Sequence, residues 1–337
     1  MNFVTGGTGL VGAYLLKELI LRNEPVKALR RSSSSLNVPK NVFQAYLGED
    51  WQQYFDKIQW VEGDILDPIS LEEAIAGVDY VYHSAGYVSY QPEDNQKLFD
   101  INQKGTGNIV NACLSTKVRK MLYVSSIAAL DKPIEGNIHR EDIITKASKN
   151  TSNYGKSKQL GEMEVWRGFE EGLNMVIINP SIIFGYGNPD KGSTKLFRKI
   201  YNGLKFYTPG TSGFVDVKDV VEIMIQLMES DISGKRFIVN SENLSFEKAF
   251  HIIAEAFNKP APKWKATPLM SEIYWRLEWV KSKLTGQQAI VTRETARAGQ
   301  RDNFYSNQKI RETLGYEFIP IEKTAKEIAS FLKKDFS

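Results

Sequence analysis

The sequence predicts an α/β fold in which a doubly wound parallel sheet carries helices on both faces. Short apolar runs typical of buried strands recur through the first half of the chain, and segments with helical spacing of apolar residues separate them. A glycine-rich segment joins the first strand to the first helix. Because the carboxyl ends of parallel strands meet at one edge of such a sheet, we expect the functional residues to gather there.

The glycine-rich segment, residues 5–12 (TGGTGLVG), follows a short strand at 2–4 and opens a helix. In this context Gly6 is expected to take the tight turn, Gly9 to admit a pyrophosphate, and Gly12 to let the helix pack on the strand. The phosphates would meet free N–H groups at the helix N-terminus. The pattern predicts a Rossmann-type dinucleotide site, against a structural turn or another phosphate ligand. The other positions of the segment expected to contact the cofactor are Thr8, Leu10 and Val11.

The second predicted strand, 26–29, ends on Arg30 and Arg31. NAD-specific folds of this type usually carry an acidic residue about 20 residues beyond the glycines to hold the ribose 2′-hydroxyl, whereas arginine accommodates a 2′-phosphate. The basic strand end therefore predicts NADP (NADPH), with NAD as the alternative cofactor. A solvated pair of arginines is the other interpretation of these residues.

Two further strands are predicted at 60–64 and 78–83. Asp64 is expected either to accept a hydrogen bond from adenine or to serve as an ordinary turn residue. The second of these strands opens into small residues, whose size would let a cofactor approach. These residues are Ser84, Ala85 and Gly86. The remaining elements of the sheet domain are strands at 121–124 and 175–178 and helices at 95–115 and 152–170.

Tyr154 and Lys158 are four residues apart, which puts a phenol and an ammonium on one face of the expected helix. The ammonium would lower the phenol pKa, so that Tyr154 exchanges a proton with a substrate oxygen near neutral pH. Ser126, at the end of the strand 121–124, would hydrogen-bond the same oxygen. Ser125 is its competitor, because one residue of register decides which serine faces the site.

Beyond Pro180 the pattern becomes less regular and indicates a smaller α/β substrate lobe at the C-terminal end. We expect residues 1–179 to form the NADP-binding domain and 180–337 the substrate-binding lobe, with segments near 213–257 returning to the core. The elements predicted in the second part are strands at 214–217 and 236–239 and helices at 193–201, 218–229, 246–257, 309–314 and 322–332.

Residues 268–284 form an amphipathic helical pattern. Three interpretations stay open: packing against the sheet lobe, a lid over an apolar substrate, and a surface that lies on a membrane. The apolar face is expected to comprise Leu269, Met270, Ile273, Tyr274, Leu277, Val280 and Leu284.

Composition limits the other classes of function. The 43 Lys and Arg nearly balance the 40 Asp and Glu, so the formal charge of +3 predicts no general attraction to nucleic acid. Cys113 is the single cysteine and only three histidines occur, so neither a disulfide nor a metal centre is expected. The chain shows no secretory signal and no membrane-spanning run, which predicts a cytoplasmic protein with no integral membrane segment.

In combination, these motifs resemble those of the extended short-chain dehydrogenase/reductase family, also called the NAD-dependent epimerase/dehydratase superfamily, and within it the dihydroflavonol 4-reductase-like branch. The resemblance implies that Tyr154 is the general acid/base, Lys158 binds the nicotinamide ribose and tunes Tyr154, and Ser126 orients the substrate. The segments that carry the resemblance are 5–12, 64–65, 83–86, 125–126, 154–158, 179–181 and 214–217, with 26–31, 305–307 and 314–317 typical of the branch.

The resemblance also implies cofactor contacts at Asp64, Ile65 and Pro180, and a homodimer formed through the helices at 95–115 and 152–170. Three positions depart from the family pattern. Gly86 stands where a second Ala is usual, Asn179 where an Arg often precedes the Pro, and Arg30 where NAD-dependent sugar epimerases keep an acid. The last departure argues against an epimerase.

The leading hypothesis is an NADP-dependent oxidoreductase that transfers a hydride between nicotinamide and a ketone, an aldehyde or a secondary alcohol by a Ser-Tyr-Lys mechanism. Such an enzyme would take a small-molecule carbonyl or alcohol as its substrate. A nucleotide-sugar epimerase or dehydratase that retains its NAD(P) is the enzymatic alternative. A non-catalytic dinucleotide-sensing protein is the alternative from another class.

Overall fold

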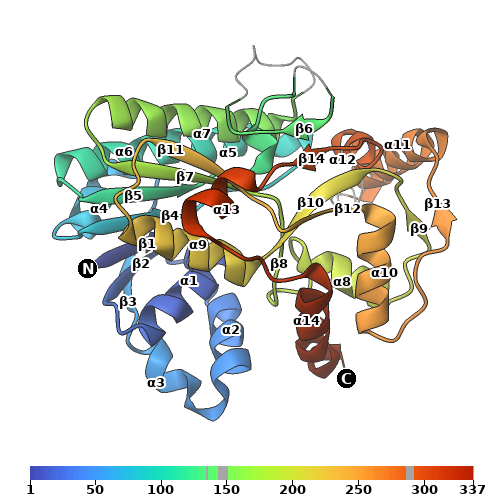
Figure 1. Cartoon of the computed structure of the whole chain (residues 1–337), viewed down its shortest axis with the longest axis horizontal. Coiled ribbons are helices and arrows are strands. Elements are labelled where there is room, and N and C mark those ends of the chain that lie inside the picture. Colours follow the sequence, from blue (N-terminus) through green and yellow to red (C-terminus); the bar gives the residue numbers. More distant parts are fainter. Residues whose placement is uncertain (134–135, 143–150, 286–291, 337) are drawn as a thin grey trace.

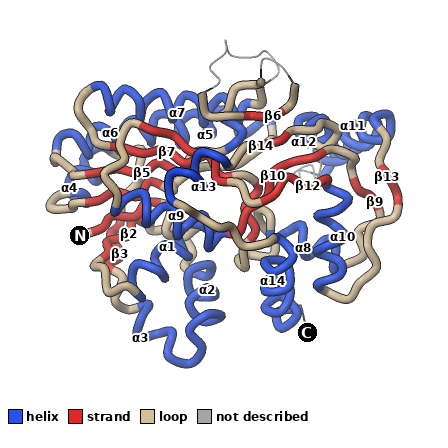
Figure 2. Tube along the Cα trace, viewed as in Figure 1, coloured by secondary structure: helices blue, strands red, loops and turns tan. Residues whose placement is uncertain are grey.

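A seven-stranded parallel sheet organises the chain, with the strand order β11-β7-β5-β4-β1-β2-β3 (Figures 1 and 2). The structure is a computed structural model that describes residues 1–133, 136–142, 151–285 and 292–336. The direction in which strands are added reverses between β1 and β4, which creates the crevice where such sheets bind ligands. The predicted doubly wound sheet is confirmed. Its strands are β1 Asn2–Thr5, β2 Val26–Arg30, β3 Gln59–Glu62, β4 Tyr80–His83, β5 Lys120–Val124, β7 Met175–Pro180 and β11 Lys235–Val239.

Helices cover both faces of this sheet, as Figure 1 shows. Apolar side chains seal each face, with Leu15 and Val220 in one cluster and Ile109 and Val165 in the other. One face carries α1 Leu10–Leu21, α2 Asn37–Leu47, α3 Trp51–Phe55 and α9 Val217–Glu229. The other carries α4 Pro68–Ile75, α5 Asn95–Phe99, α6 Thr106–Ser115 and α7 Asn153–Glu170. A π-helical turn, Asp100–Gly105, joins α5 to α6.

Side-chain caps explain where several helices begin. Ser152 accepts a hydrogen bond of 2.9 Å from Gly155 N at the start of α7. Asp216 accepts one of 2.7 Å from Lys218 N at the start of α9. Each cap satisfies a backbone donor that the first helical turn leaves open, which fixes the residue at which the helix begins. The observed starts of α7 and α9 differ from the predicted ones by one residue.

The second lobe is built on a three-stranded sheet of β8 Ile182–Phe184, β10 Thr211–Asp216 and β12 Glu242–Ser245. Since α9 and β11 follow β10 in sequence but lie with the large sheet, the division at residue 179 stays a nominal one. The helices of this part are α8 Thr194–Tyr201, α10 Phe246–Ala256, α11 Pro268–Thr285, α12 Arg293–Ala298, α13 Gln308–Leu314 and α14 Ile321–Phe336. Two short parallel pairs complete it: β9 Phe206–Tyr207 with β13 Trp264–Lys265, and β6 Ile138–His139 with β14 Phe304–Tyr305.

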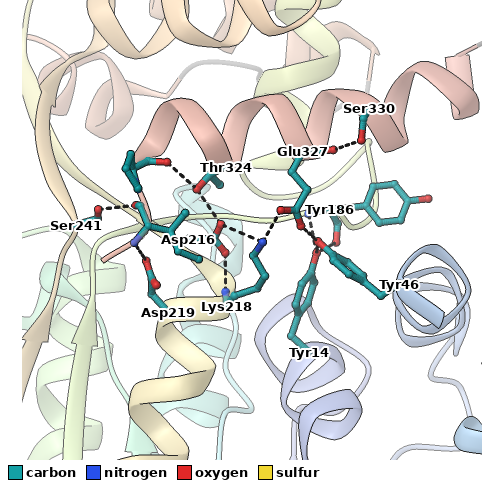
Figure 3. Close-up of polar contacts among 12 residues, drawn as sticks. Tyr14, Tyr46, Tyr186, Asp216, Lys218, Asp219, Ser241, Thr324, Glu327 and Ser330 are labelled. Carbon is teal, nitrogen blue, oxygen red and sulfur yellow. Dashed lines mark hydrogen bonds and ion pairs between the residues drawn. The ribbon is translucent and has the colours of Figure 1, made fainter. Parts of the chain in front are cut away.

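A polar network ties the last helix, α14, to the sheet domain (Figure 3). Thr324 donates to Asp216 over 2.8 Å, and Glu327 accepts from the Tyr46 hydroxyl over 2.6 Å and pairs with Lys218. Tyr46 also accepts a hydrogen bond of 3.2 Å from Tyr14 of α1. The network joins α1, α2, α9 and α14, so the two lobes are held together by side chains from distant parts of the sequence.

The exposure of the apolar side chains of helix α11 contradicts one of the three interpretations of its sequence. Its predicted apolar residues are exposed rather than packed, with Leu269 at 71% and Leu277 at 62%. The interpretation that packs this face against the sheet lobe is therefore wrong. The side chain of Leu284 lies outside the described residues.

Candidate active site

The glycine loop closes tightly between β1 and α1. Gly6 has φ +74°, and a Cβ there would come within 2.6 Å of Ala85 N. A Cβ on Gly12 would lie 2.2 Å from the Gly6 carbonyl oxygen, so neither position accepts a side chain. Gly9 is exposed, and in the described part of the chain no side chain caps α1. The loop therefore leaves N–H groups at a helix N-terminus open to an anionic ligand, which fits the pyrophosphate of a dinucleotide.

Thr8, Leu10 and Val11, the other loop positions named above, are partly exposed along the same stretch. The segment after β4 is bonded directly to this loop. Ser84 Oγ donates 2.7 Å to the Thr5 carbonyl, and Ala85 N donates 3.2 Å to Thr5 Oγ1. Thus the small residues after β4 lie beside the glycine loop.

His83 is a structural residue of this edge. Its Nδ1 lies 2.7 Å from Thr5 Oγ1 and its Nε2 lies 3.1 Å from Thr106 Oγ1. Burial, with the nearby Lys158 charge acting in the same direction, lowers the His83 pKa to about 3. The imidazole is therefore neutral at physiological pH and takes no part in acid–base chemistry there.

The two arginines lie at the end of β2, Arg30 half-buried and Arg31 exposed. Among the described residues neither guanidinium forms an ion pair, so both are accessible to an anion. Asp64 fills a turn, since its Oδ1 accepts a hydrogen bond of 3.0 Å from Leu66 N. Ile65 is 8% exposed and packs in the core, where a Cβ on Gly105 would come within 2.7 Å of its side chain. Contact of Asp64 or Ile65 with a cofactor stays a prediction.

Tyr154, Ser126 and Lys158 come together at the ends of β5 and α7. The Tyr154 side chain lies close enough to that of Ser126 for the serine to influence the phenol pKa. Lys158 Nζ donates 2.9 Å to the Val124 carbonyl and 3.3 Å to the Tyr123 hydroxyl. A Cβ on Gly86 would lie 3.2 Å from Lys158 Nζ, so this helix meets the segment that borders the glycine loop.

Burial controls the acid–base properties of these groups. The pKa of Tyr154 is raised by burial, and the neighbouring Ser126 side chain opposes that shift. The expected lowering of the Tyr154 pKa is therefore wrong for the arrangement described, because burial outweighs it, and stabilisation of the phenolate by Lys158 stays a prediction. Burial lowers the pKa of Lys158 to about 8, while the Glu162 carboxylate acts to raise it. Lys158 is thus a cation that titrates just above neutral pH.

Ser125 points away from Ser126 into a buried network that the sequence analysis did not find. Its Oγ donates 2.5 Å to Glu162 Oε1, which also accepts 2.6 Å from Asn179 Nδ2. Arg236 of β11 lies 3.2 Å from Glu162 Oε2. The four-residue spacing of Lys158 and Glu162 could have indicated that the two share a helix face. The partners of Glu162 on β7 and β11, Asn179 and Arg236, could not be predicted from spacing.

Two more residues beside the site were missed. The ring of Tyr90 lies edge-on to that of Tyr154, with centroids 5.7 Å apart and planes at 69°. Asn102, in the π-helical turn, donates 2.9 Å to Ser157 Oγ and accepts 2.8 Å from Tyr87 N, which links α7 to the loop after β4. A π-helical turn is common at functional sites but has no simple sequence signature.

The remaining predicted contact is Pro180, which is buried at the end of β7 opposite Val239. Asn179, which precedes it, donates 3.0 Å to the Ser126 carbonyl and so supports the serine-bearing turn. In the described ranges no cluster of three His, Cys, Asp or Glu side chains is arranged to hold a metal ion. Nor do the described ranges contain a helix with the length and apolar character needed to span a bilayer.

The switch-point crevice, the glycine loop and the polar groups at the same sheet edge define a dinucleotide-binding enzyme of the α/β class. A family model described as "NAD dependent epimerase/dehydratase family" matches residues 2–240. The chain therefore belongs to the NAD-dependent epimerase/dehydratase family, and the predicted resemblance to extended short-chain dehydrogenase/reductases is confirmed. It is an NAD(P)-dependent enzyme whose cofactor is NAD or NADP.

Several known proteins are similar over most of the chain. It is 26% identical to sterol demethylase protein B of Methylococcus capsulatus, over 80% of this chain and 79% of that protein. It is 27% identical to a putative dihydroflavonol 4-reductase of Synechocystis, over 93% of this chain and 89% of that protein. The crystal structure of gox2253 superposes with a TM-score of 0.80 at 24% identity, covering 99% of this chain and 98% of that one, which supports the fold.

Proposed function

We propose that the protein is an NADP-dependent oxidoreductase that interconverts a carbonyl compound and the corresponding alcohol. The observation that carries this proposal is the placement of the Tyr154 and Ser126 side chains beside each other, with the buried Lys158 four residues further along the helix of Tyr154. Relatives named as reductases, among them the putative dihydroflavonol 4-reductase from Synechocystis, support the assignment of carbonyl reduction.

In reduction, Tyr154 donates its phenolic proton to the substrate oxygen. The raised pKa keeps this phenol protonated at neutral pH, as a proton donor requires. Ser126 Oγ accepts a hydrogen bond of 3.1 Å from Ala128 N, which leaves its O–H to donate toward the same oxygen. Lys158 supplies positive charge that stabilises the phenolate left behind.

A nicotinamide cofactor held at this site would supply the hydride for the carbonyl carbon. The glycine loop would hold the pyrophosphate, and Gly86 and Pro180 would border the nicotinamide half. Arg30 and Arg31 would pair with a 2′-phosphate, because a guanidinium fork suits phosphate and the residues carry no competing ion pair among those described.

The second candidate is an epimerase or dehydratase that retains its cofactor. The family description supports it, and the same Tyr154, Ser126 and Lys158 would serve that chemistry. The two candidates differ in whether the cofactor leaves after each turnover. The predicted homodimer through α5, α6 and α7 would suit either one, and exposed Met163 on α7 is available for such a contact.

The test is titration of NADPH and NADH into the natural protein, Arg30→Ala and Arg31→Ala. We expect preference for NADPH, with at least one variant weakening NADPH binding about tenfold and leaving NADH binding unchanged. Lys40→Ala, an exposed lysine on α2, is the matched control. Equal affinity for both cofactors, or NAD already bound to the purified protein, would contradict the NADP assignment and favour the cofactor-retaining alternative.

A further inference from the structure

Helix α11 is packed with its polar side inward. Glu278 is 8% exposed, and Ser271 Oγ accepts 2.9 Å from Gln300 Nε2. Glu272 lies 3.7 Å from Arg297 of α12. The polar residues of this amphipathic helix therefore make its contacts with the rest of the chain.

The opposite side of α11 is a large exposed apolar surface, which we call the outer face. The exposed fractions of its side chains run from 41% at Met270 to 71% at Leu269. Its members are Leu269, Met270, Ile273, Tyr274, Leu277 and Val280. An apolar surface of this extent is uncommon unless it meets a partner.

The short sheet before α11 extends this surface. Trp264 of β13 and Phe206 of β9 are register partners, so their side chains lie on the same side of the pair. They are 63% and 45% exposed. Figure 1 shows β9 and β13 beside α11, at the end of the molecule away from β3. Tryptophan and tyrosine side chains of this kind favour the boundary between water and lipid.

The charges near the outer face are mostly positive. Between residues 259 and 285 the only acids are Glu272 and Glu278, and both belong to the inward side of α11. The basic residues of the same segment are Lys259, Lys263, Lys265, Arg276, Lys281 and Lys283. Arg276 pairs with Glu272 and Lys283 with Glu93, and the segment still carries a net positive charge, so this surface is complementary to an anionic one.

We propose that the outer face of α11 binds the surface of a membrane that contains anionic phospholipids. Exposed apolar and aromatic side chains with flanking lysines are the features of a helix that lies in a lipid interface. A symmetric contact with a second copy would bring the same lysines of both copies together, with their acids facing inward. A lid would turn its apolar side toward the substrate, whereas α11 turns its polar side inward.

Membrane binding would also orient the active site. Lys283, near the end of α11, pairs with Glu93 over 3.0 Å, and Glu93 belongs to the loop that carries Tyr90 beside Tyr154. A docked chain would therefore hold this loop close to the lipid surface. The docking itself does not depend on the reaction that the site catalyses.

The test is flotation of the full chain with vesicles of phosphatidylcholine alone or mixed equally with phosphatidylglycerol. We expect binding to the mixed vesicles that weakens as salt is added. The double variant Ile273→Glu, Leu277→Glu should reduce the bound fraction at least about tenfold. Ile69→Glu, a 73% exposed residue on α4, is the matched control and should bind like the natural chain. NADPH titration checks that each variant remains folded.

Lys263→Gln with Lys265→Gln should reduce the preference for the anionic vesicles while leaving the apolar outer face intact. Absence of vesicle binding by the natural chain would overturn the proposal. So would equal losses in the α11 and Ile69 variants. If the natural chain does not bind vesicles but self-associates in sedimentation experiments, and the α11 double variant does not self-associate, the outer face would instead be assigned to contact with a second copy of the chain.

Discussion

Ser125 Oγ donates a hydrogen bond of 2.5 Å to Glu162 Oε1, which turns this serine away from the neighbouring Ser126. Ser126 is left with its hydroxyl beside Tyr154. The two adjacent serines after β5 thus have different surroundings. Ser125 belongs to a buried ionic network, and Ser126 faces the candidate substrate site. This difference makes the two serines a matched pair for experiment.

Ser126→Ala should reduce kcat/KM about 100-fold with little change in thermal stability, because it removes a donor to the substrate oxygen. Ser125→Ala should instead destabilise the fold by about 1 to 3 kcal/mol, because it removes a partner of a buried carboxylate. Steady-state kinetics and urea unfolding of both variants separate these effects. The opposite pattern would assign the catalytic position to Ser125.

Tyr154→Phe should lower kcat at least about 100-fold, since the variant lacks the proton donor, while NADPH affinity stays unchanged. Tyr90→Phe is the control, because it keeps the ring packed against residue 154 and removes only a hydroxyl. Turnover by Tyr154→Phe at the natural rate would rule out both the reductase and the epimerase mechanisms.

The pH profile of reduction should reflect Lys158, whose pKa burial lowers to about 8. Above that pH the ammonium loses its proton and no longer stabilises the phenolate, so kcat/KM should fall. Glu162→Gln should move the fall to lower pH, since the carboxylate acts to raise this pKa. Glu164→Gln, a partner of Arg167 on the same helix, should leave the profile unchanged. An unshifted profile in Glu162→Gln would separate Glu162 from this titration.

Asp219 predicts a pH dependence of stability. It is fully buried, accepts 2.9 Å from the Tyr316 hydroxyl and 3.0 Å from Ile319 N, and burial raises its pKa from 3.8 to about 7. The folded state then binds more protons than the unfolded state between these pH values. Its contribution to stability is complete below about pH 4 and is lost as the pH rises through about 7.

The magnitude of this loss is about 2 to 4 kcal/mol. Asp219→Asn cannot ionise, so its deficit relative to the natural chain should be larger at pH 5 than at pH 8. Urea unfolding at both pH values measures the difference, and Asp56→Asn, an exposed carboxylate, is the control. A deficit that is the same at both pH values would show that Asp219 does not titrate in this range.

The strands and helices of the sheet domain were predictable because their signals are local. The strand predicted at 121–124 is observed as β5 Lys120–Val124, and the helix predicted at 152–170 begins one residue later. Gly6 and Gly12 were identified for the same reason, since tight turns and close backbone contacts restrict single positions to glycine. The fold class and the dinucleotide site therefore follow from short stretches of sequence.

Tertiary structure decided what depends on partners distant in the chain. It bonded Ser125 to Glu162, which lies on another element, and it brought Tyr90 to Tyr154 across a loop. It also turned α11 outward, because amphipathic spacing predicts a helix but not which side meets the protein. By itself the sequence determined the sheet, the glycine loop and the Tyr154–Lys158 helix face. Only packing between distant segments determined which side chains share a site and which meet the surroundings.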